Sequence, residues 1–321
     1  MVSVSGRALR GVLRAFDHLR GTALWGGQRG VLRVAGADAG GQRDRSFRAD
    51  GRDGAPDRSG ARCWHRADGR GPCADPAGLG MAERTHPSTH PSGAPWRNFH
   101  GRRHGKTLRP GHRALLEELL PQLSPGPVSW EENPARTPLD LAARFGGREI
   151  WLEVGFGGGE HMIAQARANP DVAIIGCEPF INGVAMALAG IRDAGVDNIA
   201  IHAGDARDLF DVLPDGAIGR AFLLYPDPWP KTRHHARRFV TPQHLGPLAR
   251  VMAGGAELRV ATDIADYVRQ TLEEVPRAGF EWCADTPRDW RQAWPGWAST
   301  RYEAKALREG RTPHYLTFRR R

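Results

Sequence analysis

The chain contains 321 residues, of which 40% are hydrophobic, and it carries a formal net charge of +9. This apolar fraction is enough to form a buried core and excludes a wholly disordered chain. The four cysteines form no CxxC pair, so neither a disulfide framework nor a zinc site is predicted. No apolar run approaches the ~20 residues that a membrane-spanning helix needs, and we expect a soluble, cytoplasmic protein that holds no metal.

Residues 1–80 differ in composition from the rest of the chain. They contain 14 arginines and eight aspartates but no Lys, Glu, Ile, Asn or Tyr, and they supply six of the nine net positive charges. Sixteen of them are glycine, and residues 36–80 show no hydrophobic periodicity that would offset the entropy of ordering them. We predict that residues 1–80 are disordered or lie upstream of a true start at Met81. A genuine basic tail and an organellar transit peptide are the alternatives.

Two later stretches of the chain are strongly basic. Residues 97–113 contain six Arg and Lys residues and no acidic residue, and residues 231–238 have the sequence KTRHHARR. Such clusters are typical of a surface that binds a polyanion, although the first stretch is equally consistent with a solvated tail. We interpret residues 81–111 as a basic N-terminal arm. Phosphate contacts are predicted for five side chains: Arg102, Arg103, Lys106, Arg237 and Arg238.

From residue 149 onward, short apolar runs alternate with segments of helical periodicity. Strands are expected over residues 149–154, 172–177, 199–202, 221–224 and 257–261, with helices between them. One of these helices is expected to end at Gly254-Gly255. Repeated βα units predict a mainly parallel sheet with helices on both faces. Residues 280–283 and 314–318 suggest a terminal antiparallel pair, and we assign residues 112–321 to this single α/β domain.

A glycine cluster follows the first of these strands. Gly155 and Gly157 stand where the backbone must turn tightly and approach a ligand closely. Glu160 stands where the third glycine of a dinucleotide-binding fingerprint belongs, and its carboxylate would repel a pyrophosphate at the helix N-terminus. This departure disfavours a nicotinamide-dependent oxidoreductase, which remains one alternative.

Acidic residues mark the ends of the first three strands, where ligands of such a sheet bind. Glu153 suits a ligand that bears an ammonium group, and Glu178 follows Gly155 at about the ~20-residue spacing of an acid that binds ribose hydroxyls. Asp205 and Ala206 offer a carboxylate and a backbone N–H to an adenine ring. Together these residues predict S-adenosyl-L-methionine as the cofactor.

The fourth strand leads into the sequence Tyr225-Pro-Asp-Pro-Trp-Pro-Lys231. The prolines on either side of Asp227 fix the backbone, so its carboxylate is held at a strand end rather than on a mobile loop. Trp229 adds a stacking or packing surface beside it. The alternative is a proline-rich turn with an incidental acidic residue.

The order of these motifs resembles that of the bacterial tRNA (guanine-N7-)-methyltransferase family, which modifies guanine 46 in the tRNA variable loop. The motifs are Glu153-Val-Gly-Phe-Gly-Gly-Gly-Glu160, Gly176-Cys-Glu-Pro179, Tyr225-Pro-Asp-Pro-Trp-Pro-Lys231, Arg237-Arg238, Ala261-Thr-Asp263 and Ser299-Thr-Arg-Tyr-Glu303. The resemblance runs from about Gly101 to Arg320. It implies a Rossmann-like class I methyltransferase fold, with a seven-stranded, mainly parallel sheet whose last strand is antiparallel.

The resemblance also implies roles for individual residues. The cofactor site would be lined by Glu153, Glu178, Asp205 and Asp227. The guanosine would be contacted by Lys231, Asp263, Thr300, Arg301, Tyr302 and Glu303. Two departures are Pro230, which stands where relatives commonly have histidine, and residues 1–80, which have no counterpart.

The chemistry of guanine N7 assigns the catalytic role to Asp227. N7 has an in-plane lone pair and no proton, so its methylation needs in-line placement against the methyl donor and no general base. The product ring is cationic, and a carboxylate at Asp227 would stabilise the positive charge that grows during transfer. A non-catalytic RNA-binding protein is the other alternative, but it would be expected to have lost at least one of the four strand-end acids, and all four are present.

Overall fold

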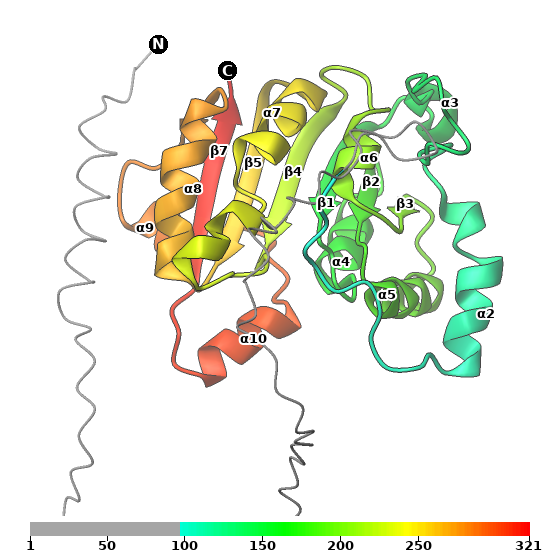
Figure 1. Ribbon diagram of the computed structural model, residues 1–321, viewed down its shortest axis with the longest axis horizontal. Coiled ribbons are helices and arrows are strands. Elements are labelled where there is room, and N and C mark those ends of the chain that lie inside the picture. The colour runs from blue at the N-terminus through cyan, green and yellow to red at the C-terminus, as the bar shows by residue number, and fades with distance from the viewer. Residues whose placement is uncertain (1–96) are drawn as a thin grey trace, which may run out of the picture. The chain divides into compact units, whose positions relative to one another are not determined.

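The computed structural model describes residues 97–321, so the predictions for residues 1–80 and for residues 81–96 of the basic arm lie outside the described residues. Seven strands form one sheet in the order β3-β2-β1-β4-β5-β7-β6 (Figure 1). The strands are β1 (Glu149–Val154), β2 (Val172–Cys177), β3 (Ile199–His202), β4 (Ile218–Leu224), β5 (Met252–Thr262), β6 (Phe280–Trp282) and β7 (His314–Arg320). Only β7 runs antiparallel to its neighbours. This arrangement confirms the predicted fold class.

Helices cover both faces of this sheet (Figure 1). They are α2 (Pro110–Glu118), α3 (Leu141–Phe145), α4 (Glu160–Ala168), α5 (Ile181–Ala194), α6 (Ala206–Phe210), α7 (Pro242–Val251), α8 (Ala265–Arg277), α9 (Arg288–Arg291) and α10 (Arg301–Arg308), with 3-10 turns η1 (Pro121–Leu123) and η2 (Thr232–Arg237). Apolar residues of α4 and α5 pack on one face and those of α6, α7 and α8 on the other. Strand β1 serves both layers, because Trp151 belongs to the first core and its neighbours Ile150 and Leu152 belong to the second.

The end of α7 differs from the sequence prediction. The helix ends at Val251, and Gly254-Gly255 lie inside β5 rather than at the helix end. Met252 already pairs with Ile218 of β4, and the register shifts before the next pair. The pairing with β4 therefore starts the strand early, and the glycines occupy its irregular first part, where Gly255 has a φ of 83°.

The strand order reverses between β1 and β4, which creates a crevice beyond their carboxyl ends. Sequence reasoning placed the ligand site at this edge of the sheet. Within residues 97–321, no helix is long and apolar enough to cross a membrane.

Candidate active site

A cavity of about 790 Å³ lies at the carboxyl ends of β1, β2 and β4. Among the residues predicted from the sequence, those that line it are Gly155, Glu178, Asp205, Ala206, Asp227, Tyr302, Arg102 and Arg237. Its volume is in the range of roughly 300–1,000 Å³ that is typical of small-molecule and cofactor pockets.

The glycine loop between β1 and α4 forms one wall of the site. Gly155, Gly157 and Gly159 have φ values of 73°, 57° and 80°, a conformation that side chains with a Cβ adopt at a cost. Glu178 ties this loop to the end of β2, because its Oε2 accepts from the Gly157 N–H at 2.9 Å and its Oε1 from the Phe180 N–H at 2.9 Å. Burial raises the pKa of Glu178, and these two donors offset part of that rise.

Glu153 occupies a different environment from the one that the sequence suggested. Its side chain is buried, with 2% of the residue exposed, and it is absent from the cavity lining. Its Oε2 lies 2.6 Å from Nδ1 of His161 in α4. The carboxylate that was expected to meet an ammonium group is thus paired inside the protein, and no sequence pattern marked His161 as its partner.

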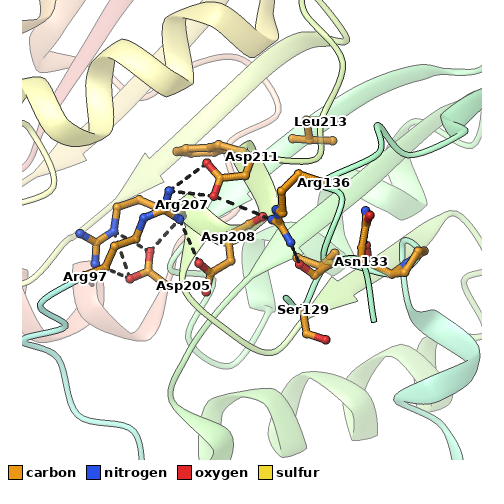
Figure 2. A network of polar contacts seen from close by, with 12 residues as sticks. Arg97, Ser129, Asn133, Arg136, Asp205, Arg207, Asp208, Asp211 and Leu213 are labelled. Atoms are coloured by element: carbon orange, nitrogen blue, oxygen red, sulfur yellow. Dashed lines mark hydrogen bonds and ion pairs between the residues drawn. The ribbon is translucent and has the colours of Figure 1, made fainter. Parts of the chain in front are cut away.

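Asp205 caps the N-terminus of α6 and lines the cavity, but its carboxylate is already partnered (Figure 2). It accepts from the Arg207 backbone N–H at 2.9 Å and from the Arg207 guanidinium, with an Nε–Oδ1 distance of 3.1 Å. Burial alone would raise the pKa of Asp205, but the contacts with Arg207 outweigh it and lower the pKa. Arg207 also donates to the Asn98 carbonyl at 3.0 Å, and Arg97 bonds Asp208 of the same helix at 2.9 Å.

Asp227 is held rigidly at the mouth of the cavity. The residues two positions to either side, Tyr225 and Trp229, have φ values of 48° and 39°, which are unusual for residues other than glycine. The Asp227 carboxylate is exposed and has no hydrogen-bond or ion-pair partner within residues 97–321. Partial desolvation raises its pKa. Among the described residues, the site therefore presents a carboxylate without a partner, on a constrained loop, to a ligand that enters the cavity.

Comparison with known proteins identifies the family. A family described as putative methyltransferase matches residues 147–316. The tRNA (guanine-N(7)-)-methyltransferase of Ruegeria sp. (strain TM1040) is 68% identical over 231 residues, which are 72% of this chain and 91% of the relative. That of Ruegeria pomeroyi is 71% identical over 226 residues, covering 70% and 95%. The chain belongs to the tRNA (guanine-N7-)-methyltransferase family.

Among solved structures, the 16S rRNA methyltransferase KamB aligns with a TM-score of 0.44 at 17% identity, over 56% of this chain and 92% of that chain. Family membership makes the protein a methyltransferase and removes the oxidoreductase and non-catalytic alternatives.

Arg238 of this methyltransferase is buried and paired inside the protein, unlike the exposed phosphate contact that the sequence predicted. Only 1% of the residue is exposed, and its guanidinium donates to the carbonyl of Pro228 at 2.8 Å and to Gln270 Oε1 at 2.9 Å. Its Nη2 pairs with Asp266 at 3.0 Å. Arg238 therefore stabilises the loop that contains Asp227, because it donates to the backbone of that loop from the protein interior. A run of basic residues in a sequence does not reveal which of them the fold buries.

The two basic stretches meet at the mouth of the cavity. His100 of the first and Trp229, which precedes the second, have ring centroids 6.4 Å apart, and Arg237 covers the Trp229 ring at 5.0 Å. Asn182 of α5 anchors the first stretch, since it accepts from the Gly105 N–H at 2.7 Å. Arg102 and Arg237 line the cavity. The exposed cations of the two stretches that have no acidic partner in the described part of the chain are Arg102, Arg103, Lys106, Lys231, Arg233 and Arg237.

The residues assigned to guanosine by resemblance have separate environments. Asp263 forms an ion pair with Arg311. Thr300 caps α10 by accepting from the Glu303 N–H at 3.1 Å, and Arg301 pairs with Glu160. These side chains and those of Lys231 and Glu303 are absent from the cavity lining. Tyr302 alone of the group lines the cavity, and it is 47% exposed.

Proposed function

We propose that this methyltransferase transfers the methyl group of S-adenosyl-L-methionine to N7 of guanine 46 in the tRNA variable loop. The observation that carries the proposal is the Asp227 carboxylate, which lines a cofactor-sized cavity together with Arg102 and Arg237 and, like those two cations, has no ion-pair partner within residues 97–321. Such a site suits a cationic small molecule inside and a polyanion outside.

The cavity lining fits the cofactor. Glu178 lines the cavity, and within residues 97–321 each of its oxygens accepts one backbone N–H, which leaves a second acceptor position on each for ribose hydroxyls. Ala206 follows the helix cap Asp205 and would meet the adenine edge, while Gly155 allows close backbone approach. The pKa values of Glu178 and Asp227 are both raised, and Asp227 adds to the rise at Glu178. Two neighbouring carboxylates favour a ligand with positive charge.

Bound S-adenosyl-L-methionine would supply an electrophilic methyl group on a cationic sulfur. The protein's own residues then have positioning and electrostatic work only, since N7 of guanine presents a lone pair and has no proton to lose. Asp227 would accept hydrogen bonds from the guanine edge and stabilise the charge that the purine gains. The prolines around it keep the carboxylate in place, so little reorganisation is needed when that charge appears.

The substrate tRNA would contact the cations at the cavity mouth. Lys231 and Arg237 follow the loop of Asp227 in the chain, and both are exposed and have no acidic partner within residues 97–321. Arg102 also lines the cavity. Guanine must leave its tertiary contacts to reach the cavity, at a cost of a few kcal/mol, which phosphate contacts would offset. A tRNA-modifying role also implies that the protein works in the cytoplasm, where tRNA is modified.

The test is incubation with labelled S-adenosyl-L-methionine and hypomodified tRNA, followed by mapping of 7-methylguanosine. We expect label at guanine 46 and none in a tRNA that carries adenine there. Label at another guanine, or undiminished label in the adenine-46 tRNA, would refute the assignment of position.

A further inference from the structure

Two carboxylates that the resemblance assigned to ligands are connected inside the protein through the side chains of His161 and Trp297. Glu153 and Glu303 are 2% and 4% exposed, and neither lines the cavity. Glu153 Oε2 lies 2.6 Å from His161 Nδ1, and Glu303 Oε2 accepts from the Trp297 indole N–H at 2.9 Å. The rings of His161 and Trp297 have centroids 5.0 Å apart. These contacts form a chain of four side chains from the end of β1 to α10, in which Trp297 is partly buried and the other three are buried.

Helix α4 contributes His161 to this series of contacts, and it has two further contacts with the segment around the start of α10. Glu160, its first residue, pairs with Arg301. Gln165, further along the helix, donates to the Gly296 carbonyl at 2.9 Å. Because α4 begins directly after the glycine loop, these contacts fix the start of α10 relative to that loop.

Tyr302 is the side chain that this arrangement positions. Its ring lies so close to the glycine loop that a Cβ on Gly157 would be 3.1 Å from Tyr302 Cε2. The next residue, Glu303, is held on the buried side by Trp297 and by the hydroxyl of Tyr315. Two adjacent residues of α10 therefore have different environments: Glu303 is buried in the protein, and Tyr302 lines the cavity.

We propose that His161 and Trp297 are positioning residues that hold Tyr302 against the glycine loop, and that Glu303 acts through this support rather than by touching guanosine. Tyr302 is then the member of its segment that contacts the ligand. The proposal rests on the proposed function only in taking the cavity as the cofactor and guanosine site. The proposal therefore means that the glycine loop and the start of α10 keep a fixed position relative to each other.

A double-mutant cycle between Trp297 and Tyr302 tests the proposal. Trp297→Phe keeps a ring against His161 but removes the donor to Glu303, and Tyr302→Ala removes the positioned ring. Dissociation constants for S-adenosylhomocysteine, by calorimetry, and for tRNA, by filter binding, are the readouts. We expect Tyr302→Ala to weaken at least one ligand by about tenfold and Trp297→Phe to weaken the same ligand by about threefold or more. The double variant should be no weaker than Tyr302→Ala alone, since Trp297 acts through Tyr302.

Trp282→Phe is the matched control. Trp282 is buried in β6, and within the described residues its indole nitrogen has no hydrogen-bond partner, so the same substitution removes no such contact near the site. It should leave both dissociation constants unchanged. If Trp297→Phe does not fold, His161→Asn, which keeps a donor to Glu153, and His161→Leu, which does not, replace it. The leucine variant should then be the weaker binder.

Independent effects would overturn the proposal. If Trp297→Phe and Tyr302→Ala multiply in the double variant, or if Trp297→Phe alters neither constant, Trp297 does not act through Tyr302. Both constants are measured without methyl transfer. Absence of methylation at guanine 46 would therefore refute the proposed function and leave the outcome of the cycle to decide this inference.

Discussion

Substituting the adjacent residues Arg237 and Arg238 separately is expected to give opposite phenotypes. In Arg238→Gln, the carbonyl of Pro228 and the side chains of Gln270 and Asp266 lose their guanidinium donor. Removing one partner of a buried ion pair costs about 3–5 kcal/mol. Asp266 keeps Arg269 at 3.0 Å, so the lower end applies and we expect a loss of about 3 kcal/mol in the free energy of unfolding. For a domain of this size that lowers Tm by about 6–12 °C.

Arg237→Gln should instead leave Tm unchanged, because the guanidinium is exposed and lies over the face of the Trp229 ring. If it makes one phosphate contact, the slope of log Kd for tRNA against log salt should fall by about 0.7–0.9. Urea unfolding and filter binding over a series of salt concentrations measure the two effects. The reasoning is refuted if Arg238→Gln has a normal Tm and a reduced salt slope, because that arginine would then be free to reach RNA.

Five further outcomes are expected. Asp227→Asn should lower kcat about ten- to a thousand-fold while S-adenosylhomocysteine binds within a few-fold of normal; near-full single-turnover methylation would reduce Asp227 to a shape element. Because the raised pKa of Asp227 belongs to a group that must be ionised, kcat should fall on acidification with a midpoint above the ordinary Asp value of about 3.9, and this limb should shift or vanish in Asp227→Asn. Gly157→Ala should lose about 1 kcal/mol or more of stability at its φ of 57° and weaken cofactor binding; calorimetry showing neither would contradict the close approach of the loop. Burial lowers the pKa of His202 and His244 to about 4, so the unfolded chain binds more protons than the folded chain between pH 6.5 and 4. On acidification through that window, the free energy of unfolding should decline by roughly 2–3 kcal/mol per group. In His202→Gln, the free energy of unfolding measured with urea should depend less steeply on pH. A chain that begins at Met81 should fold and methylate like the full chain, and a clear loss of tRNA affinity would instead make residues 1–80 a binding arm.

The sequence by itself determined the sheet and the edge at which the site lies. Apolar runs and glycine positions are local signals, and a parallel βα order forces strand ends to one edge, so the glycine loop, Glu178 and Asp227 were predicted to converge, and all three line the same wall or mouth of one cavity. The prolines around Asp227 likewise have local consequences, because they fix φ whatever the rest of the chain does.

Only the tertiary structure decided the partner of each charged side chain. Glu153 and His161, Asp205 and Arg207, and Arg238 and Asp266 are pairs whose members stand from two to 28 positions apart, with no periodicity to mark them. Arginine is buried at position 238 and exposed at position 237. The buried Arg238 donates to the backbone carbonyls of Pro228 and Trp229 in the loop before η2, whereas Arg237 is exposed to solvent. The type of a charged residue tells which partners it can bind. The packing of the folded protein decides whether a neighbouring side chain is already bound to that residue.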